Sequence, residues 1–364
     1  MIFNGYLLIM FFSSNKEVIV MSPPLLSDSY VYPLIKIEFV HTIQFHSFYI
    51  VLRSKKFMKH HHAIIGILIS MFILAQVIGL VVMNKYVDIE KSKESGSVMF
   101  RDLQIAGTEL ERPEIEASTS FLYMMFGVLV GTAMLLLIIR WNIAFLWKLW
   151  FFMAVLICLS LSFGAFVNSY LAAVLGIVLA YYKIFRPNVV VQNITELFMY
   201  GGLAVIFVPI MDLFSGIGLL VLISLYDMYA VWKSKHMVTL AKFQSSQHIF
   251  AGMLIPYFLK PHKTPRVPMH MHPQPLLKNQ SFSKGMISHA MLGGGDLGFP
   301  LLFSGVIMKT YGLWQAYAII PFAALALYIL FLKGEQNRFY PAMPALSLGC
   351  FAGLGFVELV SILF

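Results

Sequence analysis

Three acidic residues of this sequence lie inside long apolar segments. Asp227 follows Ile223-Ser-Leu-Tyr, Asp296 follows three consecutive glycines, and Glu358 lies near the end of the last apolar segment. A charged side chain near the centre of a bilayer costs about 2.5–3.5 kcal/mol on insertion scales, so such residues usually face a cavity and serve a function. Asp227 and Asp296 are therefore the first candidates for chemistry. We expect Glu358 to snorkel or to pair with Lys309, and we do not assign it to catalysis.

Both aspartates are expected in the same half of the membrane, at heights that flexible helix ends could bring together. Asp227 comes six residues before Lys233, and Asp296 comes twelve residues after Lys284, or about 9 Å and about 18 Å at helical rise. Two carboxylates a few ångströms apart cannot both ionise easily, so such a pair shares a proton. The ionised member can take a proton from water while the other polarises a scissile carbonyl, which is the division of labour in an aspartic protease.

Glycines and prolines accompany these acids. Gly293, Gly294, Gly295 and Gly298 remove side chains around Asp296, which allows close backbone approach and an irregular helix. The alternative reading is ordinary helix packing through small residues. The segment 341–346, Pro-Ala-Met-Pro-Ala-Leu, opens the last apolar run. It is either simply a good helix start or an entry whose unpaired backbone groups bind an extended peptide.

The composition indicates a membrane protein. Of 364 residues, 59% are hydrophobic and 12% are charged, and the mean hydropathy is +0.79. Soluble domains are about 45–50% apolar and about 25% charged. The net charge of +9 does not indicate nucleic-acid binding, because the basic residues lie between apolar segments rather than on one face.

Neither cysteine nor histidine forms a convincing metal site in the sequence. Cys158 and Cys350 both lie in apolar runs and are interpreted as small buried hydrophobes. His262, His270 and His272 lie in a Pro-rich stretch with no carboxylate nearby, so we interpret them as solvated. We therefore expect no metal and no cofactor.

The apolar segments predict an all-α, polytopic membrane protein. Nine segments are long enough to cross a hydrocarbon core of about 30 Å as helices. Helix is the expected state because a lipid-facing backbone must satisfy its own hydrogen bonds. The nine predicted transmembrane helices span residues 63–83, 120–140, 145–163, 165–182, 196–212, 214–232, 285–308, 313–332 and 341–362.

The distribution of basic residues predicts the orientation in the cell membrane. The loops that would share one side carry eighteen Lys and Arg residues, whereas those on the other side carry six, including Lys309. The richer side is predicted to be cytoplasmic. The amino end of the first helix would then be cytoplasmic and the carboxyl terminus exoplasmic.

Four regions follow from this count. Residues 58–232 contain helices one to six, residues 233–284 form a cytoplasmic linker without Asp or Glu, and residues 285–364 contain helices seven to nine. Residues 1–57 remain unassigned, because their apolar run could be an interfacial helix, an extra crossing, or an extension before a start at Met58.

Three motifs together resemble the presenilin and signal peptide peptidase family of intramembrane aspartyl proteases, in particular an archaeal presenilin homologue. The family has Tyr-Asp in its sixth helix, Gly-x-Gly-Asp in its seventh and Pro-Ala-Leu at the start of its ninth. Tyr226-Asp227, Gly293–Asp296 and Pro344–Leu346 lie in the corresponding segments. The likeness covers roughly residues 60–364, and it implies hydrolysis of transmembrane protein or peptide substrates within the lipid bilayer.

The resemblance implies roles for individual residues. Asp227 and Asp296 would be the catalytic dyad. The residues implied in substrate binding are Tyr226, Gly293, Gly295, Pro344, Ala345 and Leu346. The predicted orientation matches presenilins and favours substrates whose amino terminus is exoplasmic. The 233–284 linker is shorter than in animal presenilins, which leaves open whether it is cut autocatalytically.

Two other interpretations remain. A prepilin peptidase also combines Gly-x-Gly-Asp with a second aspartate, but that family lacks Pro-Ala-Leu in a ninth helix. A proton-coupled transporter could use the two intramembrane aspartates as a relay and a glycine-broken helix as a binding site.

Overall fold

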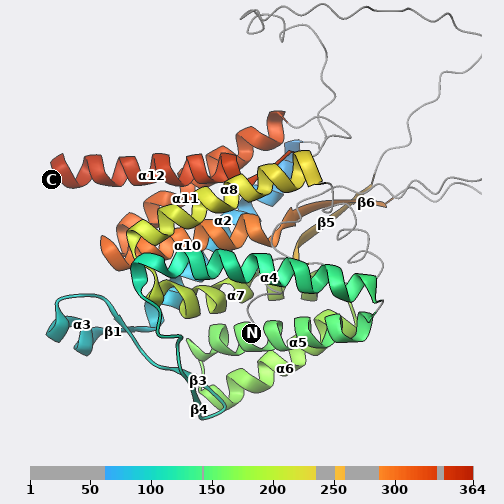
Figure 1. Cartoon of the computed structure of the whole chain (residues 1–364), viewed down its shortest axis with the longest axis horizontal. Coiled ribbons are helices and arrows are strands. Elements are labelled where there is room, and N and C mark those ends of the chain that lie inside the picture. The colour runs from blue at the N-terminus through green and yellow to red at the C-terminus, as the bar shows by residue number, and fades with distance from the viewer. Residues whose placement is uncertain (1–61, 142, 235–250, 259–286, 334–339, 364) are drawn as a thin grey trace, which may run out of the picture.

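The computed structural model describes residues 62–141, 143–234, 251–258, 287–333 and 340–363. These residues form a bundle of long helices with three small two-stranded sheets at its two ends (Figure 1). The predicted segments 1–57 and most of 233–284 lie outside the described residues.

Nine helices of the bundle correspond in order to the nine predicted segments. They are α2 (His62–Lys85), α4 (Ser120–Arg140), α5 (Ala144–Gly164), α6 (Ser169–Phe185), α7 (Val189–Phe207), α8 (Leu213–Tyr229), α10 (Gly294–Thr310), α11 (Leu313–Lys333) and α12 (Met343–Leu363). Seven are long and apolar enough to cross a membrane, and α6 is apolar but has only 17 residues. The chain is thus an all-α, multi-pass membrane protein.

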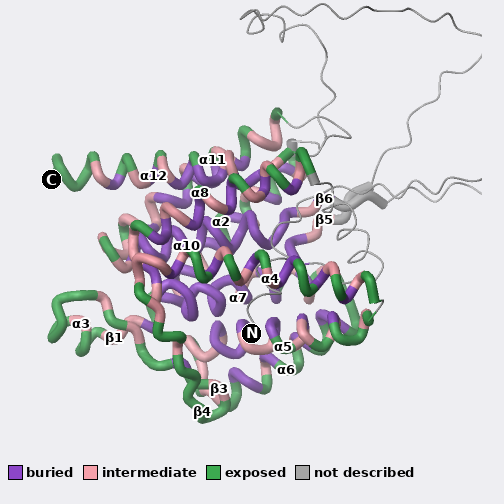
Figure 2. The backbone as a smooth tube through the Cα atoms, in the orientation of Figure 1, coloured by how far each residue is buried: buried purple, intermediate pink, exposed green. Residues whose placement is uncertain are grey.

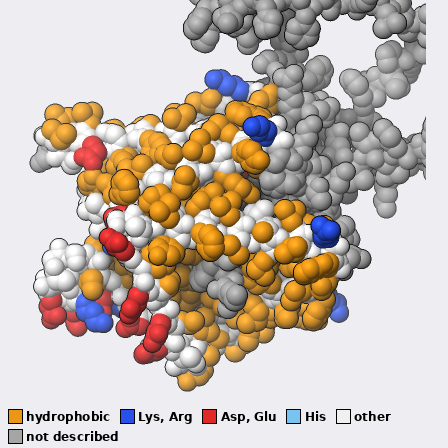
Figure 3. Space-filling model, viewed as in Figure 1, with side chains coloured by type: hydrophobic (Ala, Val, Ile, Leu, Met, Phe, Trp, Pro, Cys, Tyr) orange, Lys and Arg blue, Asp and Glu red, His pale blue; other side chains and the backbone are white. Residues whose placement is uncertain are grey.

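The surface agrees with that class. Figure 3 shows hydrophobic side chains across the whole width of the bundle, where helices such as α4 expose Phe126 and Leu129. Acidic side chains gather at the end that carries α3 (Ile89–Ser95), whereas basic side chains dot the upper and right edges (Figure 3). The short strands β1 (Val87–Asp88), β2 (Met99–Phe100), β3 (Leu103–Ile105) and β4 (Thr108–Leu110) lie at this acidic end.

Helix α10 occupies the centre of the bundle. Each of its residues from Gly294 to Met308 is buried, and α10 contacts α2, α7, α8, α11 and α12. A helix that is apolar all round and packed on every side belongs in a core. Figure 2 shows the same contrast, with burial concentrated in the middle helices and exposed residues on α4 and the outer faces.

The beginning of the seventh predicted segment is not helical. Residues Ile287–Gly293 form strand β6, which pairs antiparallel with β5 (Gly252–Phe258), and α10 begins only at Gly294. The prediction of helix across 285–308 was therefore wrong for its first part, and β5 lies within the predicted linker. A strand rises about 3.3 Å per residue, so the depth of Asp296 estimated from helical rise does not apply.

The fifth predicted segment begins too late. Helix α7 starts at Val189, capped by the side chain of Asn188, which accepts a hydrogen bond from the backbone of Val190 at 2.9 Å. Lys183, counted among the cytoplasmic loop residues, instead lies buried within α6 and forms an ion pair with Glu196 of α7, Nζ to Oε1 2.6 Å. A buried pair compensates each charge, whereas hydropathy alone ends one predicted span just before Lys183 and begins the next only at Glu196.

Candidate active site

Asp227 lies in the last turn of α8 and is only 4% exposed. The backbone N–H of Met343, the first residue of α12, donates a hydrogen bond to its Oδ2 at 3.1 Å. Three residues after Asp227, α8 is followed by a π-helical turn, Ala230–Ser234. Such turns interrupt the regular ladder and frequently occur at functional sites.

Asp296 lies where strand β6 becomes helix α10. It belongs to the first turn of that helix and is 3% exposed. Its Oδ2 has no hydrogen-bond partner within the described part of the chain. A buried carboxylate oxygen without a partner is costly, so it marks a place where a ligand, water or proton would be stabilised.

The two aspartates lie on neighbouring helices. Helices α8 and α10 pack against each other, and both contact α12. Asp227 lies at the end of α8 and Asp296 at the start of α10, and both side chains are buried. The arrangement therefore brings together two acids that are separated by 69 positions in the sequence (296 minus 227).

The start of α12 lies beside Asp227. Pro344 and Ala345 are half-buried in the first turn of α12, and Leu346 is buried. One turn before Asp227, Ser224 Oγ lies 2.8 Å from Ser347 Oγ. This side-chain bond joins α8 to α12 one turn from Asp227, so the structure brings the predicted Pro-Ala-Leu segment close to Asp227.

Gly293 and Gly295, which flank the strand-to-helix junction, are both buried next to Asp296. The hydroxyl of Tyr226 is directed toward α4, where it lies 3.1 Å from Thr132 Oγ1. The hydroxyl of Tyr226 therefore links α8 to α4, while its backbone continues directly into Asp227.

Three amide side chains near this junction were not identified from the sequence. Gln192 and Asn193 of α7 bind the backbone of β5, and Gln76 of α2 binds the backbone of Leu297. All three are polar residues in otherwise apolar helices, and that is the signal that could have found them. Gln192 and Asn193 were missed because the predicted span began at residue 196.

Glu358 and Lys309 do not pair with each other. Glu358 accepts a hydrogen bond from the Tyr311 hydroxyl, and Lys309 Nζ donates to the carbonyl oxygens of Pro209 and Met211, both at 2.8 Å. The expectation that Glu358 could pair with Lys309 was therefore wrong. Glu358 lies far along α12 from Asp227, at the opposite end of that helix from Met343.

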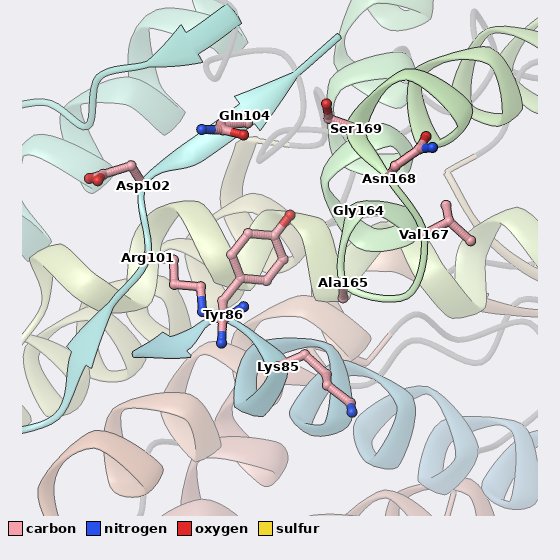
Figure 4. Close-up of a pocket in the computed structure, with 10 residues that line it drawn as sticks. All are labelled: Lys85, Tyr86, Arg101, Asp102, Gln104, Gly164, Ala165, Val167, Asn168 and Ser169. Atoms are coloured by element: carbon pink, nitrogen blue, oxygen red, sulfur yellow. The ribbon is translucent and has the colours of Figure 1, made fainter. Parts of the chain in front are cut away.

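A cavity of about 410 Å³ lies at the acidic end of the bundle, away from the aspartates. Figure 4 shows that Lys85, Arg101 and Asp102 lie around it together with Tyr86. Burial raises the pKa of Tyr86 to about 12, and its hydroxyl donates to the carbonyl oxygen of Leu161 at 2.8 Å. None of the predicted site residues lines this cavity.

The described residues contain no group of three or more His, Cys, Asp or Glu side chains that could hold a metal ion. The three histidines of the Pro-rich stretch lie outside the described residues.

Comparison with known families adds an independent observation. A sequence model of the family described as "Signal-peptide peptidase, presenilin aspartyl protease" matches residues 97–260, which include Tyr226 and Asp227. Over this stretch the chain is similar to the signal-peptide peptidase and presenilin family. The resemblance predicted from three short motifs is thereby confirmed, because the match extends over the predicted helices two to six.

Two solved presenilin-family structures are similar to this chain at low identity. One is described as "Structure of a presenilin family intramembrane aspartate protease in C222 space group", with 18% identity, a TM-score of 0.48, and coverage of 80% of this chain and 99% of that one. A second, in the P2 space group, has 17% identity, a TM-score of 0.46, and coverage of 79% and 96%. Curated proteins yield no match.

Proposed function

We propose that this protein is an intramembrane aspartyl endopeptidase in which Asp227 and Asp296 form the catalytic dyad. The observation that carries the proposal is that two acids are buried on neighbouring, directly packed helices of an apolar bundle. Intramembrane acids are retained where they serve a function, and a carboxylate pair is the apparatus that peptide hydrolysis requires.

The proposed reaction needs no metal or cofactor. The ionised aspartate removes a proton from water, and the resulting hydroxide attacks the scissile carbonyl carbon. The protonated aspartate donates a hydrogen bond to the carbonyl oxygen and then a proton to the tetrahedral intermediate. The first aspartate, protonated by water, then gives its proton to the amine nitrogen, while the second aspartate takes a proton back from a hydroxyl of the intermediate. The C–N bond breaks, the carboxylic acid and amine products form, and the pair again holds one proton.

The backbone around Asp296 suits a peptide in extended conformation. Strand β6 leads directly into the aspartate, and an extended segment could lie along its backbone groups. A helical substrate must unwind before hydrolysis, because its amide groups are shielded by internal hydrogen bonds. The proposed substrates are therefore transmembrane proteins or peptides that enter from the lipid and unwind at this site.

The charge distribution supports the predicted topology as part of the proposal. The end of the bundle that carries β5 and β6 would face the cytoplasm, and the acidic end with α3 would be exoplasmic. The oligomeric state plays no part in the proposed mechanism.

The decisive experiment uses purified full-length protein in liposomes with a tagged reporter that contains one transmembrane segment. We expect cleavage that a transition-state analogue of aspartic proteases blocks, with products mapped by mass spectrometry. Asp227→Ala and Asp296→Ala should each abolish cleavage while the protein remains folded. The matched control is Glu358→Gln, which alters another intramembrane acid and should retain activity.

If either aspartate variant kept wild-type cleavage, the dyad would be refuted. Solute flux in the same liposomes without any cleavage would instead support the transporter interpretation.

A further inference from the structure

Asp296 follows a run of residues that cannot position it by themselves. Gly293, Gly294 and Gly295 carry no side chains, and glycine has more conformational freedom than any other residue. A reacting carboxylate must nevertheless be held close to its productive geometry, because a displacement of about 1 Å can cost about 10²-fold in rate. Contacts from outside this segment must therefore supply the constraint.

The pairing of β5 with β6 supplies part of the constraint on Asp296. Gly252 pairs with Gly293, and the backbone N–H of Gly294 donates to the carbonyl oxygen of Ala251 at 3.2 Å. Residues 259–286 separate the two strands, so no two-residue turn sets their register. The position of β5 itself must be fixed by something else.

Helix α7 binds β5 through two neighbouring side chains. The Asn193 side chain donates from Nδ2 to the Leu254 carbonyl oxygen at 2.8 Å, and its Oδ1 accepts from the Leu254 N–H at 2.9 Å. This two-bond arrangement reproduces what an adjacent strand would offer. Gln192 Nε2 donates to the Gly252 carbonyl oxygen at 2.8 Å, directly across from Gly293.

The Gln192 amide is in turn oriented by a buried polar cluster. Its Nε2 also lies 3.2 Å from Glu196 Oε1, which accepts from Lys183 Nζ at 2.6 Å. The Glu196 carboxylate also accepts from the Tyr200 hydroxyl. Because these groups are buried, their hydrogen bonds are directional and cannot be exchanged for water.

A second contact acts on the other side of Asp296. Gln76 of α2 is 1% exposed, and its Nε2 donates to the carbonyl oxygen of Leu297 at 2.8 Å. Its Oε1 has no hydrogen-bond partner among the described residues. A buried amide that leaves its oxygen unsatisfied costs stability, so its retention indicates a role for the bond that it does make.

We propose that Asn193, Gln192 and Gln76 are positioning residues that hold the Asp296 carboxyl group in register by binding the backbone on both sides of it. The inference rests on the proposed function, since it assigns how one member of the dyad is placed. It makes these amides neither catalytic nor substrate-binding. Their effect is transmitted through β5 and through the first turn of α10.

The principal variant is Asn193→Ala, with Asn188→Ala as its matched control. Asn188 caps the same helix, so its loss weakens α7 without removing any bond to β5. We expect Asn193→Ala to lower kcat per active site by about 10-fold to 10²-fold, counting sites by titration with a tight-binding transition-state analogue. KM should change little, and the mapped cleavage positions should spread over neighbouring bonds.

Asn188→Ala should lower thermal stability but leave kcat per active site and the cleavage positions unchanged. Gln76→Met, which keeps side-chain volume and removes the amide, should reproduce the effect of Asn193→Ala from the other side of Asp296. It also serves as the test if Asn193→Ala does not fold.

Hydrogen–deuterium exchange gives a readout that does not require activity. In Asn193→Ala, peptides covering 251–258 and 287–297 should exchange at least several-fold faster than in wild type and in Asn188→Ala. Unchanged exchange together with unchanged kcat per active site would overturn the proposal. If the wild-type protein cleaves its reporter but Asn193→Ala changes neither exchange nor kcat per active site, the positioning role is refuted and the proposed dyad is not. If wild type does not cleave, the proposed function fails independently.

Discussion

The two aspartates differ in which contacts fix the position of their backbone. Asp227 belongs to a continuous helix, α8, whose backbone ladder fixes its direction before any neighbour contributes. Asp296 belongs to a junction between a strand and a helix, preceded by three glycines. Its position depends on bonds from α7, from α2 and from β5.

This contrast means that one half of the site is ordered within a single helix, whereas the other half is ordered by contacts that are distant in the sequence. A regular helix supplies a fixed reference for one carboxylate. A segment without side chains leaves space beside the other, but its order must come from long-range contacts. The following predictions test the contrast, beginning with the largest expected effect.

The isosteric variants Asp227→Asn and Asp296→Asn should be equally inactive, because hydrolysis requires both groups. We expect each to lose on the order of 10⁴-fold in kcat, and the double variant to lose no more than either single one. Single-turnover cleavage of a reporter in liposomes measures this. Additive losses would show that the two residues do not act as a unit.

Gly252→Ala should disturb the segment around Asp296 and leave the segment around Asp227 unchanged. Gly252 has φ +143° and pairs with Gly293, so alanine would be strained there by about 1–3 kcal/mol. We expect a loss of at least about tenfold in cleavage and faster deuterium exchange in 287–297. The control is Gly355→Ala, where an added Cβ meets nothing within 4 Å. Equal effects of the two variants would contradict the importance of β5.

Thr132→Val should have an intermediate effect on the Asp227 side. The change removes a hydroxyl that lies 3.1 Å from the Tyr226 hydroxyl, and we expect a loss of about 1 kcal/mol in stability and a few-fold loss in cleavage. Thr310→Val is the matched control, because its hydroxyl bonds only within its own helix, to Val306. Thermal unfolding followed with the cleavage rate distinguishes them.

Ser347→Ala should have the smallest effect. Ser224 still donates to the Leu220 carbonyl oxygen at 2.7 Å when Ser347 is removed, and α8 keeps its own ladder. We expect less than about 1 kcal/mol in stability and no more than about a twofold change in cleavage. A loss as large as that expected for Asn193→Ala would mean that the Asp227 side also depends on neighbouring helices.

The sequence predicts most of the helical framework, because lipid-facing helices carry a strong local signal in their hydropathy. It also predicts the two aspartates, since an acid within an apolar run is conspicuous in one dimension. The catalytic role of Asp227 and Asp296 stays a prediction, as do the roles of Gly293, Gly295, Tyr226 and the Pro-Ala-Leu segment.

The sequence does not predict the strand before Asp296. The run Ile287–Gly293 is short and largely apolar, and periodicity cannot separate a buried strand from a buried helix over that length. Its partner β5 lies 35 positions earlier (287 minus 252), and its bonds to Gln192 and Asn193 are long-range. Such pairings arise from tertiary structure and leave no local pattern.

The ion pair between Lys183 and Glu196 has a consequence for biogenesis. Inserted singly into lipid, α6 would carry an uncompensated cation, and α7 an uncompensated anion, each at a cost of about 2.5–3.5 kcal/mol. Entry as a hairpin neutralises both charges at once. We therefore expect these two helices to leave the translocon together, and the short α6 to depend on its successor for stable integration.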